Sequence, residues 1–306
     1  LHDLMSLWPR FVNLEKDLVI EKFSDVINEE ISCPFSAAIN FEEPADFFEM
    51  NVISDVIEEY FDNHVFHVGP IRTEPSTGEL ISEIDLARNE VGVKGEYTVG
   101  QLGYAADKKV EAPNDSMDGV SVRAVLDRWM GPEGLGLFET HRVESEGITE
   151  RLTVIPVGKE NSEYRDLTEL GIGVSQVLPV VLQVLLAKPG DLIMLEEPEL
   201  HLHPAAQLKL ADFFLWAVGA GRQIIVETHS EYLISRLAYH VAKNDNNEAQ
   251  DLVSIHLVES GSDGTEYTKA EIDEYGEIDW PSDFFDEGAK EALRTLEAAF
   301  KKSKNT

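Results

Sequence analysis

Cysteine is nearly absent from this sequence: Cys33 is the single one among 306 residues. One thiol cannot form a disulfide within the chain, so the fold cannot depend on a disulfide framework. The flanking residues, EEISCPFSA, include no basic residue or histidine that would activate the thiol. We therefore interpret Cys33 as a small apolar side chain that packs in the interior.

Long hydrophobic runs are absent as well. No stretch of about eighteen or more apolar residues occurs, and the N-terminal sequence LHDLMSLWPRF lacks the basic region and apolar stretch of a secretory signal. The hydrophobic content of 43% is nevertheless enough to build a core. We expect a folded cytoplasmic protein with no membrane partner. The chain begins with Leu rather than Met, so we also expect it to be part of a longer protein.

Basic residues are scarce. The chain has 25 lysines and arginines against 58 acidic residues, which gives a formal net charge of −33. Proteins that bind nucleic acid usually present a basic surface to the phosphates, and the one short cluster of this kind is Lys301-Lys-Ser-Lys304. DNA is thus a possible partner that the charge does not support. Surface carboxylates that keep the protein soluble, as in a high-salt cytoplasm, explain the composition.

The first part of the chain, residues 1–160, gives weak and mixed secondary-structure signals. The clearest are a short helix at 122–129 and a strand with weak alternation at 151–157. We predict a mixed lobe or insertion here, a second lobe over 161–260, and a C-terminal hairpin and helix over 261–306.

From residue 167 onward the signals become stronger. Gly171, Gly173 and Ser175 precede one apolar helix face, which is formed by Val177, Leu178, Val181, Leu182, Leu185 and Leu186. We predict Ser175 as the N-cap of this helix. Pro179 then falls in the first turn, where its missing N–H would have no intrahelical partner.

Two short apolar strands follow, each with a helix after it. The strands are predicted at residues 192–195 (LIML) and 223–226 (QIIV), and the helices at 204–218 and 231–242. The strands are apolar on both faces, which favours burial on both sides, and the long crossover between them indicates a parallel pair. The predicted fold class is α/β, with a mainly parallel sheet and helices on both faces.

Acidic residues and a histidine stand at the ends of these two strands. Glu196 and Glu197 follow the first strand, and His229 lies within Glu227-Thr-His-Ser230 after the second. Parallel strands end on one edge of a sheet, so these side chains should converge where open α/β sheets bind ligands. One carboxylate can hold a Mg²⁺ shell and the other can polarise an attacking water, which suits phosphoryl transfer. The glycine turn at 171–175 opens a helix whose N–H groups can bind an anion, although it has no lysine.

A metal site is an alternative interpretation of the segment after the first strand. If this segment is extended, Glu199, His201 and His203 share one face, as zinc or binuclear metallohydrolase ligands would. Two prolines bracket the segment, and His229 is the one further ligand, which argues against this interpretation. A His/Glu metallohydrolase and a non-catalytic dimerisation module both stay open as alternatives.

Three motifs in order carry a resemblance to a known family. They are LGIGVSQ at 170–176, LIMLEEPELHLHP at 192–204 and IIVETHS at 224–230. Together they resemble the second half of the ABC-type ATPase heads of SMC, RecF and overcoming-lysogenization-defect (OLD) proteins, and resemble most the prokaryotic AAA-family ATPases of defence operons. Weaker support comes from GPIRTEP at 69–75 and WPSDFFDE at 280–287. The resemblance implies an ATPase of antiphage defence or DNA repair, with ATP and Mg²⁺ as cofactors.

The resemblance also implies roles for single residues. Glu196 stands where such heads have the Walker B acid that holds Mg²⁺ through water, although aspartate is usual there. Glu197 matches the general base. His229 resembles the switch histidine that contacts the γ-phosphate.

Two further matches concern a second subunit. Gly171, Gly173 and Ser175 resemble the signature loop, which closes over the nucleotide of the opposite subunit, and His203 falls in the D-loop at the dimer interface. Gly171 stands where a serine is usual, so Ser175 would have to supply that contact. The implied assembly is a homodimer that encloses the nucleotide, with a nuclease or effector as a possible further partner.

One motif of the family is missing. No G-x-x-x-x-G-K-[ST] occurs in the 306 residues, and without that loop the β- and γ-phosphates have no cradle. The family places the loop near the N-terminus. We therefore expect an ATPase in the full-length protein and an inactive chain when these residues stand alone. No nuclease pattern follows Ser230, so any cutting would need a partner.

Overall fold

The structure is a computed structural model, and it describes residues 59–74, 79–80, 88–113, 118–146, 149–158, 163–243, 248–261, 264–280, 291 and 294–296. The predictions for Cys33, for Lys301-Lys-Ser-Lys304 and for residues 281–287 lie outside these ranges. The chain divides into two compact units, Leu1–Asp62 and Asn63–Thr306, and the strands and helices below belong to the second. The lobe boundaries at residues 160 and 260 stay a prediction. None of the described helices is long and apolar enough to cross a membrane.

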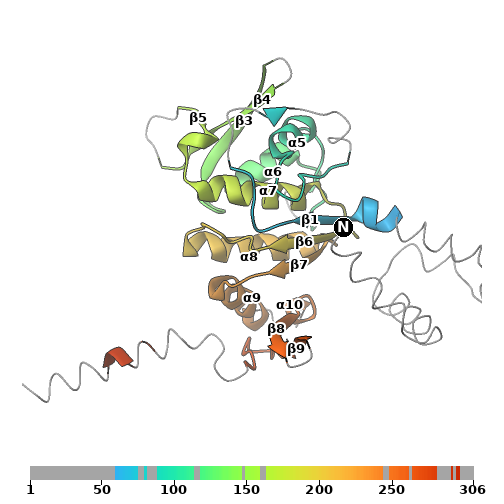
Figure 1. Ribbon diagram of the computed structural model, residues 1–306, viewed down its shortest axis with the longest axis vertical. Helices are drawn as coiled ribbons and strands as arrows, with labels where there is room; N and C mark the ends of the chain where they lie inside the picture. The colour runs from blue at the N-terminus through green and yellow to red at the C-terminus, as the bar shows by residue number, and fades with distance from the viewer. Residues whose placement is uncertain are drawn as a thin grey trace, which may run out of the picture. The chain divides into compact units, whose positions relative to one another are not determined.

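A parallel sheet of three strands carries the predicted site (Figure 1). Its order is β1-β6-β7, with bounds β1 (Val65–Val68), β6 (Leu192–Glu196) and β7 (Gln223–Glu227). Both pairs are parallel, and the register places Glu196 opposite Glu227. The predicted parallel pair and the α/β fold class are therefore confirmed. The pairing of β1 with β6 was not predicted, because four residues with a central histidine give no clear strand signal.

β7 is less buried than predicted. In the part of the chain that the structure describes, β7 pairs with β6 alone, and Ile225 is 56% exposed. β6 buries Ile193 and Leu195 and leaves its other residues half-buried. The prediction of two fully buried strands was wrong because an apolar run shows only that a strand can be buried. Its neighbours decide whether it is.

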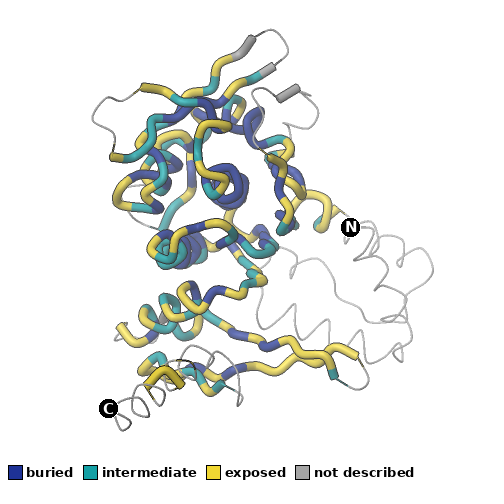
Figure 2. The backbone as a smooth tube through the Cα atoms, turned by 60° about the vertical axis from the view of Figure 1, so that its left-hand side comes forward, coloured by how far each residue is buried: buried dark blue, intermediate teal, exposed yellow. Residues whose placement is uncertain are grey.

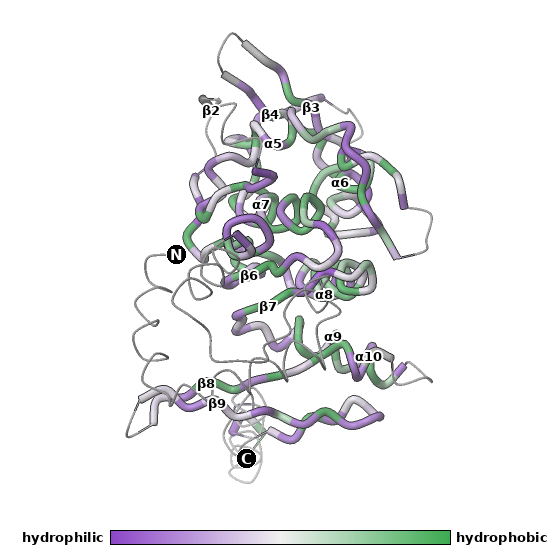
Figure 3. Tube along the Cα trace, turned by 90° about the vertical axis from the view of Figure 1, so that its right-hand side faces the viewer, coloured by the Kyte–Doolittle hydropathy of each residue, from purple (hydrophilic) through white to green (hydrophobic). Residues whose placement is uncertain are grey.

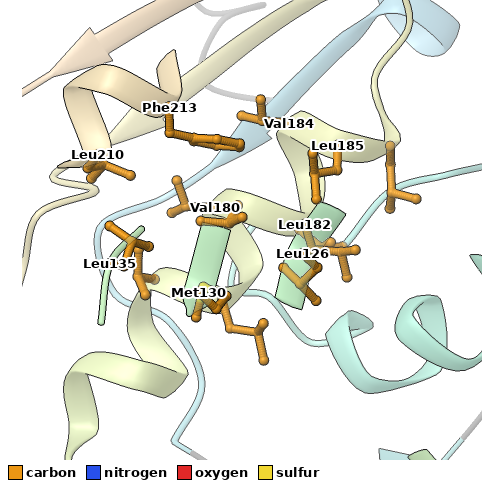
Figure 4. Close-up of a cluster of buried hydrophobic side chains, with 14 of the residues drawn as sticks. Leu126, Met130, Leu135, Val180, Leu182, Val184, Leu185, Leu210 and Phe213 are labelled. Carbon is orange, nitrogen blue, oxygen red and sulfur yellow. The ribbon is translucent and has the colours of Figure 1, made fainter. Parts of the chain in front are cut away.

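The helix α7 (Ile172–Leu186) is buried along most of its length, and every residue from Val174 to Leu186 is inaccessible or nearly so. Figure 3 shows it as largely hydrophobic. A helix that is apolar all round belongs in the interior. Its side chains lie in one cluster with Met130 of α6 (Val122–Met130) and Phe213 of α8 (Pro204–Gly219), as Figure 4 shows.

The start of α7 also differs from the prediction. The helix begins at Ile172 with Gly171 as its N-cap, so Ser175 is not the N-cap and Pro179 lies inside the helix. The Ser175 hydroxyl donates a hydrogen bond to the Ile172 carbonyl at 2.8 Å. A glycine N-cap has no side chain to mark it, whereas a serine inside the first turn carries the usual mark of a cap. The sequence therefore placed the start of the helix too late.

An antiparallel sheet packs against two helices that also contact α7. Its strand β4 (Thr149–Pro156) pairs with β3 (Phe138–Glu146), β2 (Glu79–Leu80) and β5 (Arg165–Asp166). The helices α5 (Thr98–Ala105) and α6 contact both this sheet and α7, and the 3-10 helix η2 (Leu167–Glu169) leads into α7. The predicted helix at 122–129 and strand at 151–157 are confirmed to within two residues as α6 and β4.

The chain after β6 alternates helix and strand as predicted. α8 follows β6, and α9 (Glu231–Lys243) follows β7. A short helix, α10 (Glu248–Asp251), precedes the antiparallel hairpin of β8 (Ile255–Gly261) and β9 (Gly264–Ala270). Much of this hairpin is exposed (Figure 2). Val258 and Tyr267, which face each other in it, are 57% and 71% exposed. The main core is therefore built by the elements from β1 to α9.

A buried arginine closes the C-terminal end of α7. Arg222 is 2% exposed. Its Nε donates to the Ala187 carbonyl at 2.8 Å, and its Nη1 donates to the Glu111 carbonyl at 2.9 Å. Burial lowers the pKa of Arg222, and the charges of Glu111 and Asp191 oppose that shift. The arginine satisfies a carbonyl that the helix end leaves free and complements the helix dipole.

Asp212 joins α8 to α9. Its carboxylate accepts hydrogen bonds from Arg236 at 2.6 and 3.0 Å and lies 2.7 Å from Nε2 of His240. Burial alone would raise the pKa of Asp212, but the hydrogen bonds and charges of Arg236 and His240 outweigh it and bring the pKa below its ordinary value. The contact fixes α9, whose first residues follow the predicted switch histidine.

We predict that Asp212→Asn lowers the free energy of unfolding by about 1.5–3 kcal/mol near neutral pH, because it weakens charge-assisted hydrogen bonds. A carboxylate with a depressed folded-state pKa stabilises the protein above its unfolded pKa, and this contribution is lost as the pH falls through the folded pKa. The difference from wild type should therefore shrink below about pH 4. Urea unfolding at several pH values measures it, with the exposed Asp251→Asn as control. A difference that does not depend on pH would contradict this assignment.

Candidate functional site

The acidic pair and the histidine meet at the carboxyl edge of the parallel sheet. Glu196 ends β6 opposite Glu227 of β7, and the Glu197 amide donates to the Glu227 carbonyl at 2.9 Å. Nε2 of His229 lies 3.8 Å from Oε1 of Glu197. The expected convergence of the two strand ends is confirmed. The imidazole of His229 is 82% exposed, so it is open to a ligand at this edge.

Glu197 has an unusual backbone conformation. Its φ is +42°, in the left-handed region that few residues other than glycine adopt. The Glu197 carbonyl also accepts a hydrogen bond from the Leu200 amide at 3.2 Å, which closes a tight turn after the strand. Backbone strain of this kind is kept where the surroundings over-determine it, often at functional sites. The turn sets the direction in which the Glu197 carboxylate leaves the sheet.

Glu196 is engaged by a histidine of the neighbouring strand. Nε2 of His67, on β1, lies 2.6 Å from Oε1 of Glu196, and both side chains are about one-third exposed. This contact uses one carboxylate oxygen. The carboxylates of Glu196 and Glu197 are both partly exposed at this edge. Mg²⁺ prefers oxygen ligands, and one or two carboxylates together with water molecules are enough to hold it. The residues present therefore fit the acidic side of a Mg²⁺ site.

Arg72 lies beneath the acidic turn, and sequence reasoning noted it only as part of GPIRTEP. It is 4% exposed, and its Nη2 donates to the carbonyls of Glu196 at 2.6 Å and Glu197 at 3.0 Å. Burial lowers the pKa of Arg72 to about 10, although the charges of Glu199, Glu197 and Glu196 act in the opposite direction. The guanidinium therefore stays charged at neutral pH, inside a group of three carboxylates.

Glu199, which lies in the acidic turn after β6, holds the segment 228–230 after β7, called the histidine loop below. It is 7% exposed, and its Oε1 accepts hydrogen bonds from the Thr228 hydroxyl at 2.6 Å and from the His229 amide at 3.0 Å. A long-range contact of this kind leaves no mark in the local sequence. Glu199 thus fixes the backbone of the residue whose side chain faces Glu197.

These contacts argue against the metallohydrolase interpretation. Glu199 points to Thr228 and His229, whereas Nδ1 of His203 accepts a hydrogen bond from the Ala205 amide at 3.2 Å and caps α8. His201 is exposed in a left-handed conformation with a φ of +62°. Within the described ranges, no group of three or more histidine, cysteine or acidic side chains could hold a metal ion. The three proposed ligands do not share a face.

The glycine turn at the start of α7 packs against the same loop. A Cβ added to Gly173 would lie 2.6 Å from the His201 carbonyl oxygen, whereas one added to Gly171 would meet nothing within 4 Å. Gly171 and Ile172 are exposed, so the free N–H groups of the helix N-terminus are accessible. The Ser175 hydroxyl is buried and bonded within the helix, so it does not face outward as a signature serine would.

Two parts of the chain match models of known protein families. Residues 104–234 match the model of a family described as AAA ATPase domain. This range includes the glycine turn, the acidic pair and His229. Residues 249–294 match a second family model, described as a protein of unknown function (DUF3696).

Two individual proteins are also similar. The Old nuclease of Escherichia phage P2 is 25% identical over 175 residues, which is 53% of this chain and 29% of that nuclease. The chain therefore spans less than a third of this curated relative. A chain from a structural study of ATP-driven dimerization and DNA-stimulated activation of SMC ATPases superposes with a TM-score of 0.35 and 15% identity, covering 48% of this chain and 82% of that one.

We predict that two glycine variants of the turn differ in their free energy of unfolding. Gly173→Ala should lower the free energy of unfolding by about 1–3 kcal/mol, because the new methyl group forces the His201 loop away from the helix. Gly171→Ala should change it by less than about 1 kcal/mol, because the space around this N-cap is open. Urea unfolding measures both. Equal stability of the two variants would show that the close approach of α7 to the His201 loop is not maintained in solution.

Proposed function

We propose that this chain takes part in ATP hydrolysis at the carboxyl edge of its parallel sheet. The match of residues 104–234 to the AAA ATPase domain and the similarity to the Old nuclease support an ATPase head of the ABC type. The observation that carries the proposal is the meeting of Glu197 and His229 from two neighbouring strand ends, beside Glu196. A carboxylate pair and an exposed imidazole at one sheet edge suit phosphoryl transfer to water.

In this proposal the two adjacent glutamates have different tasks. Mg²⁺ bound with ATP supplies charge neutralisation and orientation of the phosphates. Glu196, with one oxygen held by His67, keeps its other oxygen for the water molecules around the ion. Glu197 orients the attacking water and accepts its proton, from a turn whose conformation fixes the carboxylate.

His229 is the proposed contact to the phosphoryl group. Its ring is open to solvent, and its backbone amide is held by Glu199. A donor held in advance at the place where negative charge develops stabilises the transition state without reorganising. The loop between β7 and α9 is therefore proposed to hold this imidazole in a fixed position.

A second copy of the chain is the proposed partner at this edge. The exposed N-terminus of α7 at Gly171 and Ile172 offers N–H groups to the nucleotide of the opposite subunit. His203, which is also exposed, lies at the start of α8 beside the acidic turn and is proposed to face the same interface. Gly173 ties these two regions together within one subunit, since it contacts the His201 carbonyl.

The biological role is proposed from the similarity to the Old nuclease of phage P2. The name of this relative indicates a nuclease, and the motif resemblance supports the proposal of a function in antiphage defence or DNA repair. The match covers 29% of that nuclease, and a nuclease or effector is proposed as a further partner. DNA is an indirect partner in this proposal, because the net charge of −33 opposes direct contact with phosphates.

We predict that Glu197→Gln lowers kcat for ATP hydrolysis by about 10²- to 10⁴-fold, because an amide cannot accept the proton of the attacking water. The Kd for Mg²⁺·ATP should change by less than about threefold, because the variant keeps the shape of the side chain. Hydrolysis is measured in the protein as the cell makes it, since these 306 residues contain no phosphate-binding G-x-x-x-x-G-K-[ST] loop.

Glu144→Gln is the matched control for this substitution. Glu144 lies on β3, and its side chain is 48% exposed and remote from the parallel sheet. It should hydrolyse ATP at the wild-type rate. If Glu197→Gln hydrolyses ATP as fast as this control, Glu197 is not the general base.

A further inference from the structure

Two oppositely charged side chains are buried in the layer below the proposed catalytic residues. Arg72 is 4% exposed and Glu199 is 7% exposed. Glu199 exerts the largest of the charge interactions on Arg72. The two residues come from distant parts of the chain, one after β1 and one after β6. Neither touches solvent enough to serve as a ligand.

Each of the two residues holds the backbone of a different strand end. Arg72 donates from Nη2 to the carbonyls of Glu196 and Glu197, at 2.6 and 3.0 Å. Glu199 accepts from the His229 amide at 3.0 Å and from the Thr228 hydroxyl at 2.6 Å. One residue therefore fixes the acidic turn, and the other fixes the histidine loop.

Both residues also keep buried atoms without a hydrogen-bond partner among the described residues. These atoms are Nε and Nη1 of Arg72 and Oε2 of Glu199. Buried polar atoms without partners destabilise a fold, and an isolated buried charge does so more strongly. The opposite charge nearby is what makes each of them tolerable, so the removal of one should affect the other.

We propose that Arg72 and Glu199 form a buried positioning pair that keeps Glu197 and His229 in place relative to each other across β6 and β7. The pair acts through the backbone, so neither member is a catalytic residue. Its effect on hydrolysis rests on the proposed function, but its effect on the geometry of the edge does not.

Arginine is suited to this position and lysine is not. A guanidinium presents donors in a fixed plane, and here one nitrogen reaches two successive carbonyls. A lysine would keep the charge opposite Glu199, but its flexible ammonium has no fixed plane of donors. Arg72→Lys therefore separates the charge of the side chain from its positioning function.

Arg222→Lys is the matched control. Arg222 is also a buried arginine that donates to two backbone carbonyls, those of Ala187 and Glu111. It lies at the opposite end of β7, before the strand rather than after it. A general loss of stability should be similar in the two variants, whereas a loss of positioning should occur only in Arg72→Lys.

The test is backbone amide hydrogen exchange of His229 in this chain without nucleotide, measured by NMR and referred to the amides of α7. In Arg72→Lys, exchange at His229 should become about tenfold faster or more, because the loss of the fixed bonds to the Glu196 and Glu197 carbonyls loosens the turn that carries Glu199, the acceptor of the His229 amide. In Arg222→Lys it should stay within about twofold of wild type. Unchanged exchange in Arg72→Lys, or an equal rise in both variants, would overturn the pair.

A double-variant cycle keeps the proposal testable if Arg72→Lys does not fold. The urea midpoints of Arg72→Met, of Glu199→Gln and of the double variant are compared with wild type. A charge pair predicts that the double variant loses less than the sum of the two single losses, because no uncompensated charge stays buried. Additive losses would show two independent residues and overturn the proposal.

Kinetics separate the two proposals. In an active protein, Arg72→Lys should lower kcat by about tenfold or more and change KM by less than about threefold, since it displaces the base rather than the nucleotide. A wild-type protein without ATPase activity would refute the proposed function, while the amide exchange would still decide whether the pair exists. An active Arg72→Lys with normal kcat would refute the positioning role.

Discussion

The parallel pairing of β6 with β7 is the constraint on which the rest of this structure depends. Its register places Glu196 opposite Glu227. This pairing brings Glu197, which follows β6, and the loop with His229, which follows β7, to the same edge of the sheet. The main chain continues the ladder by one bond, from the Glu197 amide to the Glu227 carbonyl. A shift of one residue would turn each side chain of β6 to the other face of the sheet, including those of Ile193 and Leu195, which are now in the core. The position of the polar edge is therefore set by apolar packing.

Charge at this edge is compensated from within. Three glutamates occur in the four residues 196–199, in a chain that already carries a net charge of −33. Burial shifts the pKa of Arg72 only to about 10, so a full positive charge remains below the turn at neutral pH. Its hydrogen bonds to the described residues go to backbone carbonyls of the turn, which leaves the carboxylates of Glu196 and Glu197 partly exposed. The guanidinium thus stabilises the turn without neutralising its outer surface.

The sequence predicted the elements that are separated by clear breaks. β6, α8, β7 and α9 were found almost to the residue, because glycine or proline marks at least one end of the first three and the apolar face of α9 follows directly after β7. What failed depends on partners far away in the sequence. The contacts of β1 with β6 and of Arg72 with the acidic turn join residues more than one hundred positions apart. The contact of Glu199 with the His229 amide joins the segments that follow two different strands. No local sequence pattern encodes such contacts. The error at Ser175 was different in kind, since a true local signal was present but a glycine had the capping position.

The distribution of charge also bears on how a nucleotide would enter under the proposed function. The partly exposed carboxylates repel the phosphates of ATP, and Arg72 cannot bind a phosphate because its guanidinium is enclosed below the turn. Among the described residues that meet at this edge, His229 has an exposed side chain that can donate to a phosphate oxygen. The negative charge must then be neutralised mainly by Mg²⁺ that arrives with the nucleotide. An edge of this composition favours the metal complex over free ATP, and it needs further donors, such as the exposed N-terminus of α7 in a second copy, to hold the phosphates.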